Sequence, residues 1–340
     1  MLDTTKPYII GETAYIHEGD FCFLSRIVDE IAEVGLNAAK FHLLLNPESY
    51  MSRKHPLMEN IKKWVFSRKQ WSDIFNRSKE KGLDIIALCD DVESIEYIIA
   101  ERDDVFAIEI HATGLNDYFL LDAASKFDGF ILLGISGSTI EEIQYVVDFL
   151  KERNVKKIVL MYGFQSYPTD HKDINLSKML KLKDIFKLPI GYADHTAFGS
   201  PYNEIISVMP AAMGFHILEK HYTPIHGEKR IDYEAAVGKE SMKKIIELMR
   251  INLEAYGTKK LDMPNTELQY GTTGPMKKAI VARKDIQEGE KLSLDNLWFK
   301  RTKERSSVKQ NQFPKLIGLK AKKDLEKDEI IDLDKIEHKL

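Results

Sequence analysis

Residues 191–223 read GYADHTAFGSPYNEIISVMPAAMGFHILEKHYT, and the interpretation of the whole chain starts from them. The apolar segments 188–192 and 214–218 predict two strands, and segment 201–213 between them carries apolar residues at helical spacing. A strand, a helix and a second strand form one βαβ unit. Each strand is followed by a polar cluster, which contains His195 in the first case and His221 in the second. Because ligands bind at the carboxyl ends of strands in parallel α/β folds, these clusters predict a functional site.

The same unit recurs eight times from residue 7 onward. Continuous apolar strands that alternate with amphipathic helices predict a parallel sheet covered by helices. Eight such units over about 250 residues match a closed (β/α)8 barrel, or TIM barrel, better than an open sheet. We predict strands at 7–12, 37–42, 83–88, 105–110, 129–133, 156–162, 188–192 and 214–219. The connection 43–70 is unusually long, so we expect it to form a lid or a subunit contact.

The pattern changes after residue 257, which ends the predicted barrel of residues 1–257. Residues 258–275 are polar and read as a linker, and residues 276–340 read as a second, small domain. Short β-like pieces are expected at 279–282, 298–300 and 316–319. A domain of this size is not very stable alone, so we expect it to dock against a barrel or a partner.

The amino-acid composition indicates an ordinary globular protein. The 340 residues are 44% hydrophobic and 30% charged, as in ordinary globular proteins, and the net charge of −4 gives no reason to expect a nucleic-acid partner. We expect neither a signal peptide nor a membrane span, because no apolar run is long enough. Cys22 and Cys89 have no disulfide or metal spacing and suit a reducing cytoplasm. Cys22 is predicted in the core and Cys89 near the site.

The predicted barrel brings many polar side chains to one mouth. They are Glu12, Lys40, His42, Cys89, Asp90, Asp91, Glu109, His111, Gln165, Tyr167, Asp194, His195, Glu219 and His221. Converging carboxylates and imidazoles without a thiolate cluster favour Mn²⁺ or Mg²⁺ over structural zinc. A lone histidine at a strand end is more often a hydrogen-bonded rim residue, so a structural role stays open for each, and His17 is undecided. Strand parity turns Glu219 and His221 inward and Lys220 away, which predicts a structural role for Lys220.

No phosphate-binding loop of the GxxxxGK[ST] or strand-coupled GxGxxG type occurs in the sequence. The turn at 134–138, GISGS, precedes a predicted helix. Its backbone N–H groups could hold an anion, but a plain helix-capping turn explains it as well.

Several motifs resemble those of the sialic acid synthases, a family that includes N-acetylneuraminate, legionaminate and pseudaminate synthases and a spore-coat polysaccharide protein. Residues 10–20, IGETAYIHEGD, are similar to the family's IAEIGVNHNGD, and residues 40–42 to its KFQ. Residues 191–196, GYADHT, resemble GYSDHT, and residues 217–223, ILEKHYT, resemble IEKHFT. Residues 166–169 resemble its IYPT, and residues 297–318 its antifreeze-like (SAF) segment. The resemblance runs nearly end to end and implies a TIM barrel followed by a small SAF domain.

The resemblance also implies an activity, namely the metal-dependent condensation of phosphoenolpyruvate with an N-acylmannosamine-type sugar. By matching position, His195 and His221 would bind Mn²⁺ or Mg²⁺, and Glu12 would act on a metal-held water or on the sugar. The implied sugar contacts are Tyr167, Asp232 and Arg301, with Arg301 delivered by the SAF domain of a partner subunit in a domain-swapped homodimer. His42 and Gln165 occupy further substrate-binding positions of the family.

The sequence departs from the family mainly where phosphoenolpyruvate would bind. One of the family's two lysines is kept as Lys40, and the other is replaced by Glu109. Hydroxyl and amide side chains of the family are also replaced, by Leu88, Ala112, Gly134, Gln165 and Ala193. A carboxylate beside a phosphate in a desolvated site costs several kcal/mol unless it is protonated or bound to a metal.

Three hypotheses therefore remain open. The chain is a synthase that holds phosphoenolpyruvate, or a substitute three-carbon donor, differently. Alternatively, it is a metal-dependent lyase, aldolase or epimerase that acts on a sugar acid without phosphoenolpyruvate, with Glu12 and Glu109 beside a divalent metal. The predicted catalytic residues of the enzyme are Glu12, Lys40 and Glu109. The third hypothesis is a non-catalytic paralogue that binds a sugar or an active partner.

Overall fold

A computed structural model describes residues 6–258, 260–271 and 276–337. The chain divides into two compact units, Met1–Gly257 and Thr258–Leu340, and each is described by itself. The predicted linker 258–275 includes residues 259 and 272–275, which lie outside the described residues, as do the last three of the predicted second domain.

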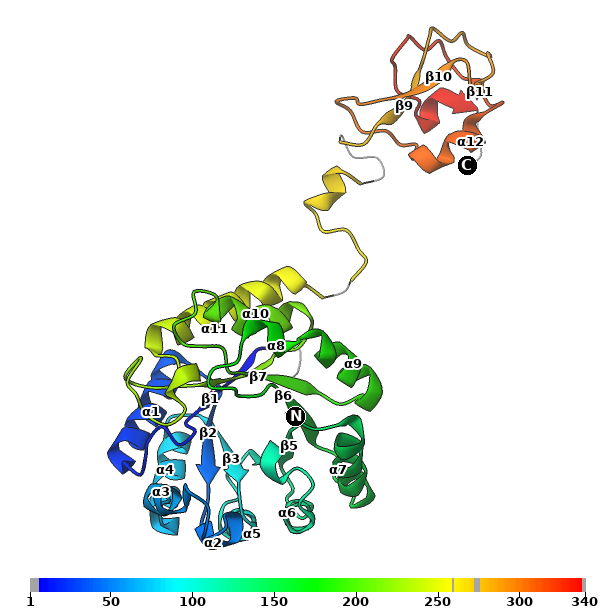
Figure 1. Cartoon of the computed structure of the whole chain (residues 1–340). Coiled ribbons are helices and arrows are strands. Elements are labelled where there is room, and N and C mark those ends of the chain that lie inside the picture. Colours follow the sequence, from blue (N-terminus) through cyan, green and yellow to red (C-terminus); the bar gives the residue numbers. More distant parts are fainter. Residues whose placement is uncertain (1–5, 259, 272–275, 338–340) are drawn as a thin grey trace. The chain divides into compact units, whose positions relative to one another are not determined.

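The first unit is a closed barrel of eight parallel strands in sequential order, as predicted (Figure 1). All eight predicted strands are confirmed, with ends that differ by up to a few residues. The strands are β1 Tyr8–Glu12, β2 Ala38–Leu43, β3 Asp84–Cys89, β4 Ala107–Ile110, β5 Phe130–Gly134, β6 Ile158–Tyr162, β7 Ile190–Asp194 and β8 Ile217–His221.

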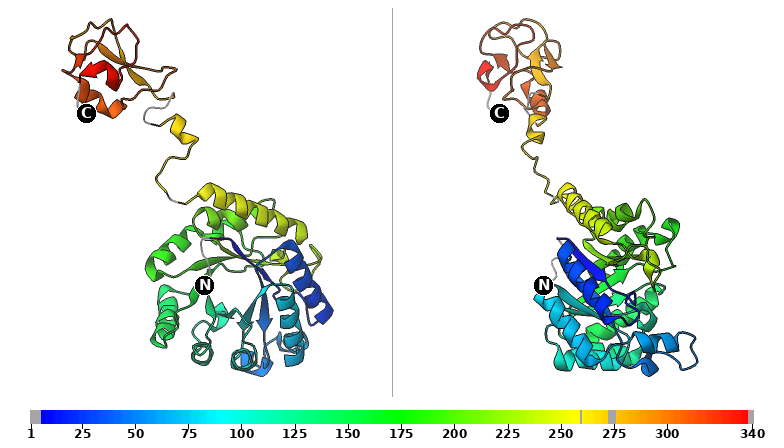
Figure 2. Two further views of the ribbon diagram at one scale, coloured as in Figure 1. Left: turned by 180° about the vertical axis from the view of Figure 1, so that it is seen from behind. Right: turned by 90° about the vertical axis from the view of Figure 1, so that its left-hand side faces the viewer.

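Helices surround this barrel, and two further views show them on its outside (Figure 2). They are α1 Phe21–Val34, α2 Pro47–Tyr50, α3 Met58–Trp64, α4 Arg68–Glu80, α5 Val92–Glu101, α6 Tyr118–Ala124, α7 Ile140–Glu152, α8 His171–Ile174, α9 Ser177–Phe186, α10 Asn203–Ala212 and α11 Lys239–Tyr256. None of the described helices has the length and apolar character needed to cross a bilayer.

The last two strands begin and end later than predicted, and this shift changes where their polar residues lie. Gly214 adopts a left-handed backbone conformation, φ 91°, in the turn after α10, so β8 starts only at Ile217. The strand then continues through Glu219 to His221, because these residues pair with Ile10 to Glu12 of β1. The polar cluster is therefore part of the barrel wall and not of the loop that follows it.

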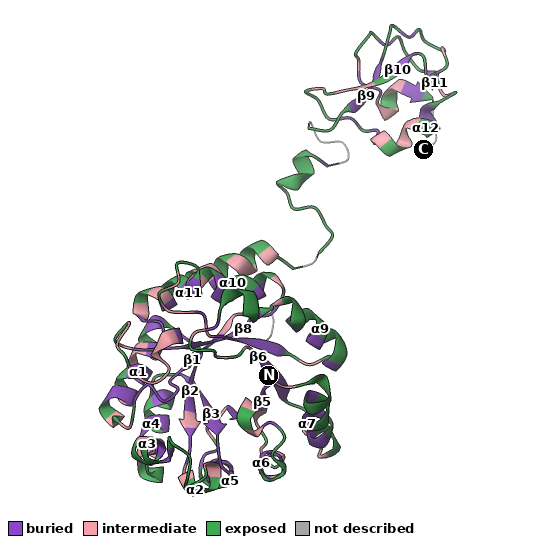
Figure 3. Cartoon of the chain, in the orientation of Figure 1, coloured by how far each residue is buried: buried purple, intermediate pink, exposed green. Residues whose placement is uncertain are grey.

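The core has two layers, and the strands are buried on both faces (Figure 3). An inner layer fills the barrel, and a larger outer layer lies between strands and helices. The inner layer consists of Ile10, Ala38, Ile86, Ala107, Leu132, Val159, Met161 and Ile217. Packing requires glycine at position 191, because a Cβ there would lie 2.6 Å from the Met161 sulfur and would clash with it.

Helix α1 shows how local sequence sets the helix ends. The Asp20 side chain accepts a hydrogen bond from the Phe23 N–H, and Gly35 ends the helix in a left-handed conformation. The apolar stripe of α1 faces the core, but Cys22 lies on its other side and is exposed. The prediction that Cys22 belongs to the core is wrong, because the residue falls outside the buried i, i+3, i+4 positions.

The long connection after β2 is not a plain loop, since it contains the short helices α2 and α3. Leu44 and Ile61 of this connection form a small apolar cluster with Tyr15 from the loop after β1. This cluster places the connection beside the strand ends.

The second unit has its own apolar core, formed around Ile280, Leu297 and Leu325. Strand β9 Ala279–Ala282 pairs antiparallel with β10 Leu297–Lys300, and β11 Lys320–Ala321 pairs with β12 Ile336–Glu337. The predicted strand 316–319 is wrong. Helix α12 Phe313–Leu316 occupies its start, and Gly318 forms a turn with φ 89°.

Candidate active site at the barrel mouth

A cavity of about 650 Å³ opens at the carboxyl ends of the strands. It is lined by most of the predicted site residues, namely Glu12, Lys40, His42, Glu109, Gln165, Tyr167, His195, His221 and Asp232, and also by His111 and Glu219. Arg301 belongs to the second unit, where its guanidinium lies 3.2 Å from the Met276 sulfur. The residues predicted on the barrel therefore converge on one cavity.

Lys40 lies at the centre of a ring of buried carboxylates. Its Nζ is 2.8 Å from an oxygen of Glu219, 2.9 Å from Glu109 and 3.4 Å from Glu12. The four side chains come from β1, β2, β4 and β8, and each is at most 4% exposed. One cation is thus shared by three acidic groups, which we call the Lys40 cluster.

The members of the Lys40 cluster have pKa values shifted in different directions: those of Lys40, Glu109 and Glu219 are raised, and that of Glu12 is lowered. Burial disfavours the Lys40 cation, but the surrounding carboxylates outweigh it and raise the Lys40 pKa, so the amine stays charged. Burial raises the Glu219 pKa well above its ordinary value, and the charge of Glu12 raises it further. Burial also raises the Glu109 pKa, against the attraction of Lys40. Glu12 differs, because Lys40 and two imidazoles overcome its burial and hold its pKa well below the usual range.

His42 adds a second cation to the mouth. Its Nε2 lies 3.1 Å from Glu12 and its Nδ1 lies 3.5 Å from Asp90. Burial opposes the charge, but the contacts with Asp90 and Glu12 raise the His42 pKa to about 10. The imidazole is therefore protonated at neutral pH, with Nε2 donating to Glu12 and Nδ1 in ion-pair contact with Asp90.

We predict a pH signature for His42. Because its folded-state pKa of about 10 exceeds the unfolded value of about 6.5, its contribution is fully present below pH 6.5 and is lost as pH rises toward 10. Wild type should lose ~1–3 kcal/mol more unfolding free energy than His42→Gln across that window. Urea unfolding at several pH values measures this difference. Parallel pH profiles of the two proteins would show that His42 is not charged in the fold.

His195 and His221 form a second feature of the mouth. Their rings lie 5.0 Å apart, centroid to centroid; His221 is buried and His195 is half-buried. Burial and the neighbouring His221 lower the His195 pKa to about 3, so this imidazole is neutral, as a metal ligand must be. His221 Nε2 lies 3.2 Å from Glu12, an arrangement in which Nε2–H donates to the carboxylate and Nδ1 is left as the acceptor.

These two residues have the donor atoms that a metal site needs. Nδ1 is buried in both rings and has no hydrogen-bond partner within the described chain. Nowhere in residues 6–258, 260–271 and 276–337 do three or more His, Cys, Asp or Glu side chains group as metal ligands. A metal here would thus have two protein ligands and open positions for water or substrate. Nitrogen donors fit Mn²⁺ better than Mg²⁺, which prefers oxygen.

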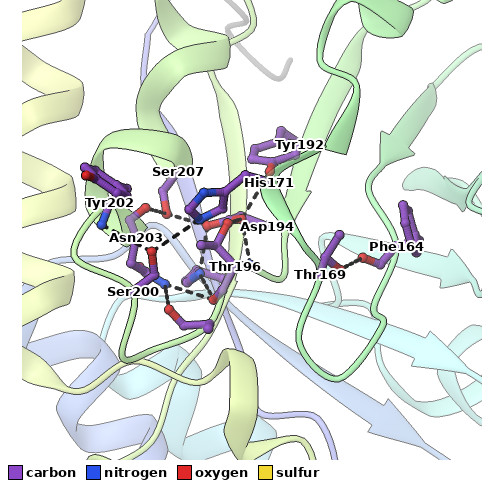
Figure 4. Close-up of polar contacts among 12 residues, drawn as sticks. Phe164, Thr169, His171, Tyr192, Asp194, Thr196, Ser200, Tyr202, Asn203 and Ser207 are labelled. Carbon is purple, nitrogen blue, oxygen red and sulfur yellow. Dashed lines mark hydrogen bonds and ion pairs between the residues drawn. The ribbon is translucent and has the colours of Figure 1, made fainter. Parts of the chain in front are cut away.

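Asp194 does not belong to the cavity, contrary to prediction. Its carboxylate points away from the mouth toward α10, where Tyr192, Thr196 and Ser207 donate hydrogen bonds to it (Figure 4). Lys220 Nζ completes this buried group at 2.7 Å from Asp194. Neighbouring residues of a strand face opposite sides, so His195 and Asp194 diverge. The structural role predicted for Lys220 agrees with these contacts.

Two residues predicted at the mouth, Asp91 and Cys89, and the undecided His17 have structural contacts. Asp91 caps α5 by accepting from the Ser94 N–H at 2.6 Å. Cys89 is buried at the end of β3, and its thiol lies 3.5 Å from the Ala87 carbonyl. His17 accepts from the Gly19 N–H and packs against Phe66, and burial lowers its pKa to about 3. His17, left undecided by the sequence, is thus a buried neutral side chain of the loop after β1.

On the side of the cavity that the resemblance assigns to the sugar, Gln165 and Asp232 are half-buried and Tyr167 is exposed. Gln165 donates to Asp232 at 3.1 Å, which ties the loop after β6 to the loop after β8. Tyr167 is 64% exposed and reaches over the cavity rim. Thr139 caps α7 after the turn at 134–138, as in a plain capping turn, although Ser136 and Gly137 line the cavity.

Sequence reasoning missed part of the site. Glu219 was placed at the mouth but was not selected as a site residue, although its parity with His221 pointed to it. Tyr15 was not predicted as a site residue, yet its hydroxyl donates to Asp90 at 3.2 Å, and its ring centroid lies 4.9 Å from that of His42 in a tilted contact. The long connection supplies Tyr50 and Trp64 to the cavity wall, and only its length signalled this.

Comparisons with known proteins agree with this geometry. The NeuB family model matches residues 27–261, and the SAF domain model matches residues 277–337. The chain belongs to the NeuB family. It is 24% identical to the N,N'-diacetyllegionaminic acid synthase of Campylobacter jejuni, over 96% of this chain and 99% of that protein.

Two solved structures resemble this chain in fold. A sialic acid synthetase from Leptospira borgpetersenii is 26% identical, with a TM-score of 0.72 over 78% of this chain and 90% of that one. A putative spore coat polysaccharide biosynthesis protein E from Chromobacterium violaceum has a TM-score of 0.83 over 98% of this chain and all of that one. At 20% identity the second comparison shows the fold alone. The barrel followed by a SAF domain is thus the NeuB arrangement, as the motifs predicted.

Proposed function

We propose that this NeuB-family chain condenses a three-carbon donor, phosphoenolpyruvate or a substitute, with an N-acylmannosamine-type or related sugar, in a metal-dependent reaction of surface-glycan biosynthesis. The product would be a sugar acid extended by three carbons. The observation that supports this most is the convergence of Glu12, Lys40, His195 and His221 on one buried mouth. These residues come from β1, β2, β8 and the end of β7, so only the closed barrel brings them together.

In this proposal His195 and His221 would hold Mn²⁺ or Mg²⁺ through their free nitrogens. When bound, the ion would polarise the aldehyde oxygen of the sugar as a Lewis acid. Glu12 holds His221 in the ligating tautomer through its 3.2 Å contact, a role that differs from the action on water or sugar implied by the resemblance. The charged Lys40 would stabilise negative charge that develops on the donor.

The sugar would bind above this centre, between the loops that carry Gln165, Tyr167 and Asp232. Carboxylate and amide groups bind sugar hydroxyls well, and Tyr167 offers an aromatic face for the ring. Arg301 would reach the site of a partner subunit in a domain-swapped homodimer. Light scattering of the full chain tests the dimer, and a monomer at working concentration would exclude it.

Incubation of the full chain with Mn²⁺, a panel of N-acylmannosamines and either phosphoenolpyruvate or pyruvate tests the reaction. We expect a sugar acid whose mass exceeds that of one sugar by the three-carbon unit, detected by mass spectrometry. Product should disappear when Mn²⁺ is omitted and chelator is added. Sugar binding by calorimetry without any product would instead support the non-catalytic paralogue.

A further inference from the structure

The positive charge of Lys40 is already compensated within the protein. Three carboxylates lie within 3.4 Å of its Nζ, so the cation is surrounded by acceptors before any substrate enters. A phosphate group binds well where several cations or N–H donors are unpaired. The Lys40 cluster provides the opposite, because a phosphate here would meet Glu109 and Glu219 as well as Lys40.

In the wider cavity, too, acidic side chains outnumber cationic ones. Its lining includes the carboxylates of Glu12, Glu109, Glu219, Asp232 and Glu234, against the cationic side chains of Lys40, His42 and Arg230. Arg230 is itself bound to Glu228 at 2.9 Å. A phosphate monoester carries about −1.5 to −2 charges at neutral pH, and phosphoenolpyruvate has a carboxylate in addition. A 2-oxo acid such as pyruvate has only the carboxylate, and this smaller charge suits the cavity better.

Glu109 lines the cavity from β4. Lys40 contacts its Oε2 at 2.9 Å, and Gly134 on the next strand borders its Oε1. A Cβ at residue 134 would lie 3.5 Å from that oxygen, so glycine leaves room beside it. Burial raises the Glu109 pKa, which makes its carboxylate a stronger base than an exposed one.

We infer that the three-carbon donor is an unphosphorylated 2-oxo acid and that Glu109 is the base that removes a proton from its methyl group. The inference rests on the proposed function, because it names the donor for that condensation. A phosphorylated enol needs no such base, since its methylene carbon is already nucleophilic. A 2-oxo acid needs one, and the cluster places a carboxylate and a cation side by side.

The chemistry balances without a further reactant. Glu109 takes one proton from the methyl carbon, and the electron pair of that C–H bond forms an enolate whose oxygen carries the charge. The methylene carbon of the enolate attacks the aldehyde carbon of the sugar, one C–C bond forms, and the aldehyde oxygen becomes an alkoxide. The alkoxide receives the proton that Glu109 took. No phosphate leaves and no water is consumed, so the reaction is reversible and a sugar acid would be cleaved to a 2-oxo acid.

The first experiment needs no knowledge of the sugar. The full chain is incubated with Mn²⁺ and pyruvate in D₂O, and loss of the methyl signal is followed by proton NMR. We expect exchange well above a protein-free Mn²⁺ blank, and a rate at least about 100-fold lower in Glu109→Gln. The matched control is Glu101→Gln, which changes an exposed carboxylate of α5 that pairs with Arg68 at 2.8 Å, and it should exchange at nearly the wild-type rate. Thermal melts check that each variant is folded.

A second variant keeps the test informative if Glu109→Gln does not fold. Glu109→Lys exchanges one carboxylate for a second cation, and it should bind phosphoenolpyruvate at least about tenfold more tightly than wild type in calorimetry. Equal affinity in the two proteins would overturn the charge argument. Exchange that persists undiminished in a folded Glu109→Gln would overturn the role of Glu109 as the base.

Two parallel assays separate failure of the inference from failure of the proposed function. Phosphate release from phosphoenolpyruvate with the sugar panel, by wild type, would overturn the inference and leave the proposed condensation standing. If wild type shows no pyruvate exchange, no phosphate release and no pyruvate formed from nine-carbon sugar acids, the inference and the proposed function both fall. Exchange together with pyruvate formation from a sugar acid is the outcome we expect.

Discussion

Replacing Lys40 by Met should lower the free energy of unfolding by about 3–5 kcal/mol, because it removes the cation that lies within 3.4 Å of three buried acidic side chains. Met fills most of the volume of the lysine stem, so a cavity contributes little to this loss. Glu12 would lose one of the two cations beside it, and Glu109 would lose its ion pair, in a site that is almost closed to water. Urea unfolding at neutral pH measures the change.

Lys220→Met is the matched control for this experiment. Lys220 is also fully buried and also contacts a carboxylate, Asp194, at 2.7 Å. Asp194 keeps hydrogen bonds from Tyr192, Thr196 and Ser207, so the loss should be smaller than for Lys40→Met. In addition, the double variant Lys40→Met/Glu109→Leu should recover part of the stability. A Lys40→Met protein as stable as Lys220→Met would contradict the view that Lys40 stabilises three buried acidic side chains.

His195→Ala and His221→Ala should each weaken Mn²⁺ binding by more than about 100-fold. Loss of a residue that only hydrogen-bonds to a metal ligand typically weakens metal binding by about 10- to 100-fold, and each of these variants removes one of two ligands. The Nδ1 atoms of these two rings are the buried nitrogens on which the metal proposal depends. Titration of Mn²⁺ followed by electron paramagnetic resonance measures affinity directly, without an assay of activity.

His111→Ala is the control for the metal experiment. His111 lines the same cavity, and burial lowers its pKa to about 4, so it too is a neutral imidazole. Its Nδ1 lies 2.9 Å from the Thr113 hydroxyl, which leaves it occupied. We expect His111→Ala to bind Mn²⁺ within about threefold of wild type. Unchanged affinity in both His195→Ala and His221→Ala would show that these residues are not the metal site.

The fold was predictable because it depends on patterns within short segments. Continuous apolar runs such as Ile158–Tyr162 can only be strands buried on both faces, and stripes such as that of α1 can only be helices that cover them. The limits of this reasoning appear at segment ends. Cys22 and residues 316–319 were misplaced, because an apolar neighbourhood does not say which face a side chain takes or where a turn begins.

The candidate site was predictable as a set of residues but not as an arrangement. Strand order and parity brought Glu12, Lys40, His195 and His221 to one mouth, as the cavity lining shows. The contacts between them depend on barrel register, which pairs Glu12 with Lys40 on one side and with His221 on the other. The register between neighbouring strands could not be predicted from any local pattern in the sequence.

Local periodicity and short motifs are enough to establish the order of strands and helices and the family. Neither predicts that three acidic side chains surround Lys40, or that Asp194 pairs with Lys220 outside the cavity. These contacts join residues that are far apart in the sequence. Glu12 and Glu219 meet at Lys40 only because the barrel closes β8 against β1. The pKa of each carboxyl group therefore depends on residues of both the first and the last strand of the barrel.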